Sequence, residues 1–186
     1  MERLSLPALV RTESERVFVM ARSSGLYRGR SLSAAVGAAI YAACRRYAIP
    51  RTLSEVAEAV GAKRFEVGRT FKVLQRGLPE TIPAIGLKVF LQRYADELAL
   101  SPVVRAQVEA MLDVAQQDPE LSGLSPHGLV AALIYLAADR SGEHRTRAEV
   151  ARVGAVTEVT LRSTSRLVER LLERSSNRGT GRAVSG

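Results

Sequence analysis

The chain repeats part of itself, and this duplication constrains the fold more than any other feature of the sequence. One set of residues recurs in the same order 94 positions later. The first set is Ser31, Tyr41, Arg51, Thr52, Glu55, Val56 and Ala57, and the second is Ser125, Tyr135, Arg145, Thr146, Glu149, Val150 and Ala151. Further along, an offset of 93 pairs Ala62, Arg69 and Leu74 with Ala155, Arg162 and Leu167. These matches predict two copies of one structural unit, with one deletion in the second.

Each copy is predicted to be a series of short helices separated by Gly, Pro and Ser. The helices expected in the first copy cover about residues 9–23, 31–47, 52–60 and 63–77. Those expected in the second cover about 88–98, 101–117, 125–138, 146–153 and 157–173. No segment alternates with period two, so we expect no sheet. The predicted fold class is therefore all-α.

The domain boundaries follow from this pattern. We expect a first repeat over residues 1–78, a second over 79–174 and a disordered tail over 175–186, which is rich in Ser, Gly and Arg. Within each repeat one helix, at 34–44 and 128–138, is apolar nearly all round. A helix of this kind is typical of the buried centre of a bundle.

The last two predicted helices of each copy are short and joined by a glycine-containing turn, which is the layout of a helix-turn-helix. The final helix of the second copy opens with Thr157, Val159, Thr160 and Arg162. Val159 and Arg162 share a face, on which Arg could bind guanine and Val a thymine methyl, and Arg166 follows where it could reach phosphate. Equally, Val159 could be core and Arg162 a solvated charge.

The corresponding helix of the first copy carries a different set of candidates. Lys63 and Arg64 lie near its N-terminus, where free backbone N–H groups also attract phosphate. Gly68 costs about 1 kcal/mol against Ala inside a helix. It therefore indicates close approach, either of another helix or of a DNA backbone, and the sequence leaves both open.

Composition agrees with a polyanionic partner. The chain has 27 Lys and Arg against 19 Asp and Glu, a net charge of +8, and 24 of the 27 cations are Arg. Arg binds phosphate and guanine edges bidentately, although GC-rich codon usage would produce the same bias. The single cysteine, Cys44, excludes an internal disulfide and a Cys-rich zinc site, and we expect it to be buried and inert.

Catalysis and membrane insertion are not expected. The two histidines, His127 and His144, have no Cys or carboxylate cluster near them in the sequence, so we expect no enzyme, metal or cofactor. The sequence shows no signal peptide and no apolar run of 18 residues, which predicts a soluble cytoplasmic protein, located at the nucleoid if it binds DNA.

Several segments resemble the core domain of archaeal transcription factor B, the homologue of eukaryotic transcription factor IIB. The segments in the first repeat are residues 25–31, 40–47, 49–53 and 66–72. Those in the second are residues 97–101, 128–135, 145–146 and 156–162. The resemblance covers roughly residues 4–173 and implies two tandem cyclin-like repeats, each ending in a helix-turn-helix.

The resemblance also implies a function. Members of this family clamp the complex of TATA-binding protein with promoter DNA and, at full length, recruit RNA polymerase. Val159 and Arg162 match the residues that read the B recognition element upstream of TATA. Gly68 and Arg69 match a pair that lies downstream, near the minor groove. An acidic stirrup of the TATA-binding protein meets the basic first repeat.

The chain departs from the family in three respects. No segment of the sequence matches the N-terminal zinc ribbon and its following linker, so we expect these residues not to hold the family's metal. Most of the first helix of the first repeat is also missing. Residues 163–165, Ser-Thr-Ser, stand where the family often has an aromatic residue, which could weaken packing or change DNA contacts.

Two other functions compete. A cyclin-like module that binds a protein partner and no DNA would fit the helical repeats, but the charge and the two helix-turn-helix units argue against it. A dimeric helix-turn-helix repressor is disfavoured by the duplication, because one chain already supplies two DNA-binding units.

Overall fold

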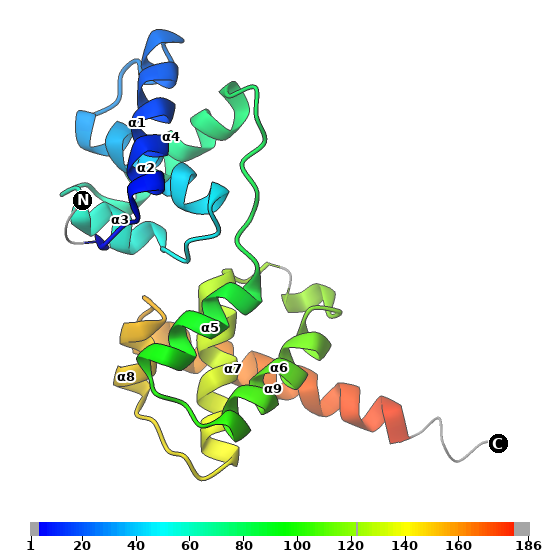
Figure 1. The fold of residues 1–186 in the computed structure, drawn as a ribbon. Coiled ribbons are helices and arrows are strands. Elements are labelled where there is room, and N and C mark those ends of the chain that lie inside the picture. The colour runs from blue at the N-terminus through cyan, green and yellow to red at the C-terminus, as the bar shows by residue number, and fades with distance from the viewer. Residues whose placement is uncertain (1–3, 122, 181–186) are drawn as a thin grey trace. The chain divides into compact units, whose positions relative to one another are not determined.

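The computed structural model describes residues 4–121 and 123–180, without the side chains of 175–180. The described part contains helices and no strand (Figure 1). The helices of its first half are α1 (Ala8–Ser23), α2 (Leu32–Arg46), α3 (Leu53–Ala59) and α4 (Arg64–Gly77). Those of its second half are α5 (Leu87–Glu97), α6 (Pro102–Ala115), a 3-10 turn (Pro119–Leu121), α7 (Pro126–Arg140), α8 (Arg147–Val153) and α9 (Glu158–Thr180). The all-α prediction is confirmed.

The chain divides into two compact units, Met1–Ile85 and Gly86–Gly186. This division falls seven residues after the boundary expected from sequence at 78/79. The reason is packing, because Leu78 and Ile82 lie beyond α4 yet join the same buried cluster as Leu74. The segment that follows α4 therefore belongs to the first unit.

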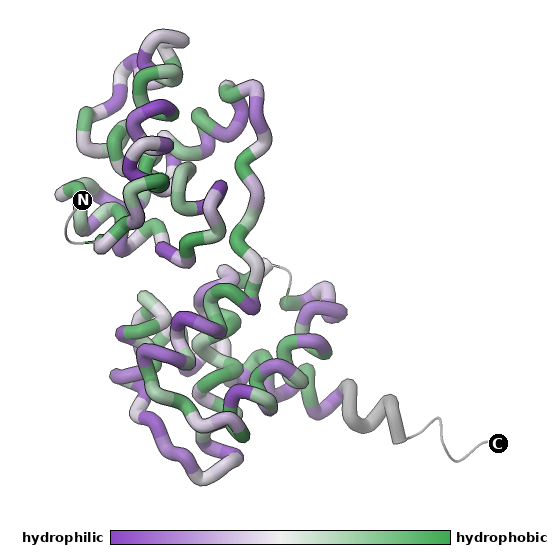
Figure 2. Tube along the Cα trace, in the orientation of Figure 1, coloured by the Kyte–Doolittle hydropathy of each residue, from purple (hydrophilic) through white to green (hydrophobic). Residues whose placement is uncertain are grey.

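In the first unit α2 is the central helix, with α1 and α4 packed against it and α3 between α2 and α4. Six of its nine buried residues are alanines, which lets neighbouring helices approach closely. Gly37 is an extreme case, since a Cβ there would lie 3.1 Å from both Val60 and Val67. Figure 2 shows how apolar and polar residues intermingle along the helices that surround this core.

In the second unit α7 takes the same role. It is buried along nearly its whole length and contacts α5, α6, α8 and α9. The apolar helices at 34–44 and 128–138 are therefore the centres of the two bundles, as predicted. None of the described helices is both long and apolar enough to cross a membrane.

The two units keep one register throughout, and the deletion inferred from sequence is wrong. The N-caps Thr52 and Lys63 correspond to Thr146 and Thr157, each 94 residues later. The left-handed turn residue of the first unit is Gly61, with φ 66°, and that of the second is Ala155, with φ 51°, again 94 later. Backbone geometry defines which positions are equivalent, so the 93-residue identities do not mark equivalent positions.

This register also corrects the residue pairs. Leu74 corresponds to Val168, and both are fully buried, whereas Leu167 is only half-buried. Arg162 corresponds to Gly68 rather than to Arg69. Phe65 corresponds to Val159, and both are exposed.

The C-terminal helix is longer than predicted. α9 continues to Thr180, past the expected end near residue 173, so residues 175–180 are helical and not part of a disordered tail. Extending an existing helix gains one backbone hydrogen bond per residue, and nothing before Gly179 interrupts it. Residues 181–186 of the expected tail lie outside the described residues.

Candidate nucleic-acid interface

The turn between α8 and α9 is built to hold the start of α9 in place. Thr146 and Glu149 form a capping box at the start of α8. At its end, Gly154 packs so closely on α7 that a Cβ there would lie 2.6 Å from the Ala131 side chain. Thr157 then caps α9, its Oγ1 accepting a hydrogen bond from the Thr160 backbone N–H at 3.1 Å. The N-terminal turn of α9 is therefore rigidly positioned.

The predicted DNA-reading residues lie on the outer face of this turn. Leu161, Thr164 and Val168 face the core, whereas Arg162 and Arg166 are exposed. Val159 is 78% exposed, which excludes the interpretation of this residue as core. An apolar side chain held in solvent beside a guanidinium is the combination that contacts a thymine methyl and a guanine edge.

The side chains of the two threonines of this turn are exposed, and their hydroxyl groups hydrogen-bond to each other. The hydroxyl oxygens of Thr157 and Thr160 lie 2.8 Å apart, and Thr157 is also the cap. Thr160 in turn accepts, through its backbone carbonyl, a hydrogen bond from Ser163 Oγ at 2.9 Å. Thr157 is thus a positioning residue first, and Thr160 retains an exposed hydroxyl beside Val159.

The departure at residues 163–165 has a definite structural place. Ser165 is buried and corresponds to Phe71 of the first unit, which is also buried and packs edge-on against Tyr41. The serine is a smaller side chain at a buried position, and it does not belong to the exposed face that carries Val159 and Arg162.

In the first unit the equivalent turn joins α3 to α4 and is followed by different side chains. Lys63 is the N-cap residue of α4 but makes no side-chain cap, so its ammonium extends outward beside Arg64, and both are exposed. Phe65 is 55% exposed, with Lys63 Nζ 5.9 Å and Arg69 Cζ 5.6 Å from its ring centroid. Phe65 is not among the residues predicted from the sequence. Its signal was its position, 94 residues before Val159.

Gly68 and Arg69 lie one turn further along α4. A Cβ on Gly68 would meet a single side-chain atom, Leu53 Cδ1, at an ordinary 3.7 Å. Helix packing therefore does not require glycine at this position. Arg69 is exposed and lines a 250 Å³ hollow with Arg30, Ser31 and Phe65, at the start of α2.

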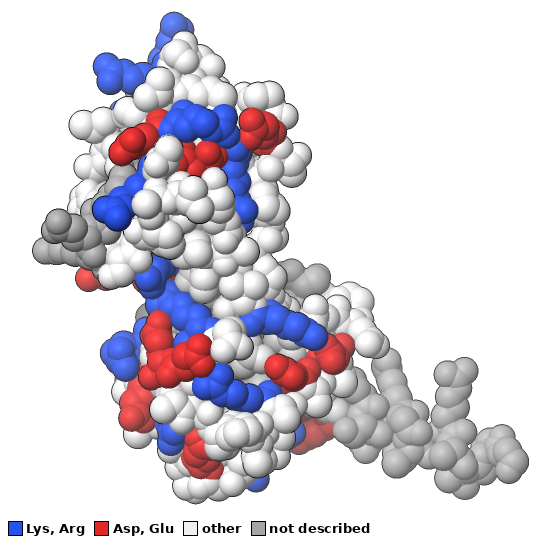
Figure 3. Space-filling view, viewed as in Figure 1, with Lys and Arg blue, Asp and Glu red and all other residues white. Residues whose placement is uncertain are grey.

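The cations of the described residues differ in whether they are paired. The face drawn in Figure 3 carries Lys and Arg interleaved with Asp and Glu. Several arginines of the described residues are paired, for example Arg145 with Glu143 and Arg93 with Glu97. By contrast, the side chains of Arg162 and Arg166 form no ion pair within the described residues.

The cysteine and the two histidines have separate surroundings. Burial raises the pKa of the Cys44 thiol to about 12, so it is the inert buried thiol expected from sequence. His144 is exposed beside Asp139, and His127 lies near the Phe90 ring. Among the described residues no three His, Cys, Asp or Glu side chains gather as a metal site would require.

The fold and its two exposed helix N-termini define a protein of two tandem helical repeats, each ending in a helix-turn-helix. The model of the transcription factor TFIIB repeat matches residues 1–77 and 82–170. The chain therefore belongs to the TFIIB repeat family.

Individual relatives agree with this assignment. Transcription initiation factor IIB 1 of Thermococcus kodakarensis is 44% identical over 171 residues, which cover 90% of this chain and 57% of the relative. The factor IIB of Pyrococcus furiosus is 42% identical over 172 residues, covering 91% and 57%. That of Saccharolobus shibatae is 41% identical over 160 residues, covering 86% and 52%. The chain spans little more than half the length of these relatives.

Proposed function

We propose that this chain is the promoter-binding core of a general transcription initiation factor. It joins the complex of TATA-binding protein with promoter DNA and reads the B recognition element upstream of TATA through α9. The observation that carries this proposal is the exposed start of α9, where Val159 and Arg162 stand side by side on a capped, rigid turn.

The reading chemistry is that of direct contact in the major groove. The Arg162 guanidinium donates to guanine O6 and N7, and Val159 packs on a thymine methyl. The Thr160 hydroxyl and the Arg166 guanidinium bind phosphate or base edges beside them, while Thr157 holds the turn. The Glu158 carboxylate, in the first turn of α9, interacts favourably with the positive end of the helix dipole. It also repels a phosphate placed directly beside it.

The first repeat contributes a contact that does not read bases in the same way. Lys63 and Arg69 lie over an exposed aromatic ring, Phe65, and Arg64 is exposed next to it in sequence. Gly68 leaves the helix surface open to a close backbone. This set suits phosphate binding and apolar contact in a minor groove downstream of TATA. Phe65 is an addition to the residues proposed from sequence.

Other assignments follow from the same proposal. The partners are promoter DNA and TATA-binding protein, with RNA polymerase as the partner of the longer family members, and the chain acts at the nucleoid. We infer no catalytic step and no cofactor, since the relatives are named as initiation factors.

The decisive experiment is a gel shift with TATA-binding protein and a promoter that carries or lacks the upstream element. Replacing Arg162→Ala should cost about 1–3 kcal/mol on the intact promoter and abolish the preference for the element. Arg22→Ala, which removes an exposed arginine from α1, serves as the matched control and should retain the preference. Full preference in the Arg162 variant would refute the assignment.

A salt titration separates this function from the alternative of a cyclin-like protein-binding module. Affinity should fall steeply with salt, because each phosphate contact releases close to one counterion. The double variant Lys63→Ala, Arg64→Ala should reduce the slope by about two while leaving the upstream preference intact. A flat profile would favour the protein-binding alternative.

A further inference from the structure

Arginines follow one another along α9 at a constant spacing of four residues. Arg162, Arg166, Arg170 and Arg174 are all exposed, and together we call them the arginine row. The sequence places a further arginine, Arg178, at the next step. GC-rich codon usage would explain arginine in place of lysine, but it does not explain this spacing. Residues four apart are neighbours on the surface of a helix, so the row is continuous.

The arginine row does not stabilise the unit that carries it. Like charges four residues apart weaken a helix. Within the described residues Arg162, Arg166 and Arg170 form no ion pair. Arg174 Nη1 lies 3.6 Å from Glu120 Oε1, but the two side chains are 62% and 60% exposed, and such a pair contributes little. The row is therefore open to an anion outside the unit.

Two glutamates of α9 limit the side from which an anion can approach. Each four-residue step turns the row by roughly 40° around the helix axis, so Arg174 points well away from the direction of Arg162. Glu169 and Glu173 return to within roughly 20° of the direction of Arg162. Only Glu169 has a printed cationic neighbour, Arg140 Nη2 at 3.9 Å. A polyanion must therefore follow the row around the helix and avoid the glutamates.

The arginine row has the length needed to leave the major groove and reach its edge. A helix rises about 1.5 Å per residue, which places Arg170 about 12 Å and Arg174 about 18 Å along the axis from Arg162. The major groove is itself about 12 Å wide. With Arg162 on a base, these two residues lie over the phosphates that border the groove. Figure 1 shows the last turns of α9 (orange to red) extending past the other helices of the second unit.

The first repeat carries only part of this row. The residues 94 positions earlier are Gly68, Lys72, Arg76 and Glu80. The helix α4 ends at Gly77, and Glu80 turns back to pair with Arg16 and Arg46. The complete row therefore belongs to the second repeat, whose last helix is longer.

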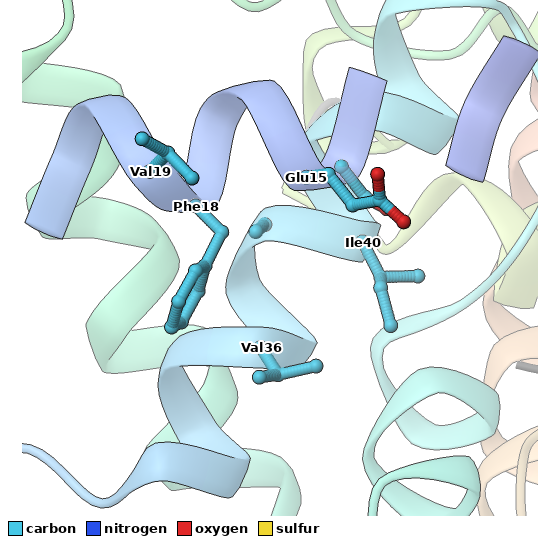
Figure 4. Close-up of a pocket in the computed structure, with 7 residues that line it drawn as sticks. Glu15, Phe18, Val19, Val36 and Ile40 are labelled. Atoms are coloured by element: carbon cyan, nitrogen blue, oxygen red, sulfur yellow. The ribbon is translucent and has the colours of Figure 1, made fainter. Parts of the chain in front are cut away.

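The surface between α1 and α2 offers no comparable place for a polyanion. Figure 4 shows Phe18, Val19, Val36 and Ile40 around a pocket there, with Glu15 at one end. No Lys or Arg among the described residues lines this pocket. An extended contact with DNA is therefore expected along α9 and not on this surface.

We propose that the arginine row binds the sugar-phosphate backbone beside the upstream element, with Arg170 and Arg174 adding affinity without reading bases. This inference rests on the promoter binding proposed above. DNA is favoured over an acidic protein because the row continues directly from Val159 and Arg162, on the exposed face of the same helix. Guanidinium groups bind phosphate through charge-assisted, often bidentate hydrogen bonds, and phosphate contacts carry no sequence information.

A salt titration of binding to the complex of TATA-binding protein with promoter DNA tests the row. The double variant Arg170→Gln, Arg174→Gln removes two charges and keeps good helix formers. It should bind about threefold to tenfold more weakly, alike on promoters with and without the upstream element. Its log–log salt slope should be shallower by about two. The matched control, Arg22→Gln with Lys88→Gln, removes the same charge from exposed cations of α1 and α5 and should leave the slope unchanged.

Photocrosslinking locates the contact. Cys44 is buried, so an aryl azide reagent modifies the thiol of an Arg170→Cys variant selectively. This variant should crosslink to a DNA strand that borders the upstream element. Glu169→Cys is the control, because it places the reagent one residue away on the acidic side of the helix, and it should crosslink much less.

The outcomes separate this inference from the proposed function. An unchanged salt slope in the Arg170, Arg174 variant, with the preference for the upstream element retained, would overturn the inference alone and assign the row to an acidic protein surface. Equal losses in the two double variants, or equal crosslinking from residues 169 and 170, would also overturn it. A wild-type chain that shows no preference for the element would overturn both.

Discussion

The two repeats share their backbone and differ in what they expose. Caps, left-handed turn residues and buried positions coincide at an offset of 94, yet the same outward position is Phe65 in one repeat and Val159 in the other. Phe65 lies between two cations, whereas Val159 stands beside Arg162. The comparison teaches that the duplicated backbone holds equivalent positions in place, and that the exposed side chains at those positions differ between the copies.

The surroundings of one equivalent position differ as well, since it is buried in the first repeat and exposed in the second. Glu13 of the first repeat is buried and bonded to Arg16 and Arg46, each at 2.8 Å, and Arg46 also meets Glu80. The equivalent residue of the second repeat is Gln107, which accepts a hydrogen bond from Ser141 Oγ at 2.7 Å. The ionic network ties the segment after α4 to α1 and α2, and the second repeat has a neutral substitute at that position.

The largest expected effect tests the register on which this comparison rests. Val168→Ala should destabilise the chain by about 2–3 kcal/mol, since it removes two fully buried carbons and leaves a cavity. Leu167→Ala removes more atoms but should cost about 1 kcal/mol or less, because Leu167 is half-buried. Urea unfolding measures both. The reverse order would restore the 93-residue register.

Most helices and the two central helices could be predicted from local signals in the sequence. Thr52, Thr146 and Pro126 are strong local helix-start signals, and the two all-apolar helices could only be centres. Residue identity misled the alignment of α4 with α9, because the turn accepts Gly61 or Ala155 in the same conformation. Phe65 was missed for the same reason, and the network of Glu13 was invisible because Glu80 lies 67 positions away in sequence.

A second prediction compares the buried charge with its neutral counterpart. The pKa of Glu13 is lowered from its ordinary 4.5, first by its hydrogen bond to Arg16 and against the effect of burial. The carboxylate therefore contributes stability above about pH 4.5, and this contribution is lost as the pH falls through the lowered pKa. Glu13→Gln should cost about 2 kcal/mol at pH 7, with the difference vanishing in acid.

Thermal or urea unfolding across pH 3–8 reports this effect. Gln107→Ala is the companion variant in the second repeat, and its cost should not depend on pH over the same range. A difference between wild type and Glu13→Gln that persists unchanged at pH 3 would show that shape, and not charge, makes Glu13 important.

A third prediction exchanges the residues of the two turns. Gly61→Ala should cost about 1 kcal/mol, because φ is 66° and a Cβ there meets nothing within 4 Å, so the cost is conformational alone. Ala155→Gly should stabilise the second repeat by a smaller amount, about 0.5 kcal/mol, by relieving the same strain. Equilibrium unfolding of both variants checks the signs, and equal signs would contradict the equivalence of the turns.

A small expected change in stability at Gly68 carries the most information about DNA. Gly68→Ala should raise stability by up to about 1 kcal/mol, since alanine favours helix and its Cβ would lie 3.7 Å from Leu53. Gly37→Ala is the contrasting control, because its Cβ would press on Val60 and Val67 and the variant should be destabilised. If DNA approaches α4 closely, the stabilised Gly68 variant should bind promoter about threefold to tenfold more weakly. A more stable variant with unchanged affinity would leave Gly68 without a role in DNA binding and would restrict the first-repeat contact to Lys63, Arg64, Phe65 and Arg69.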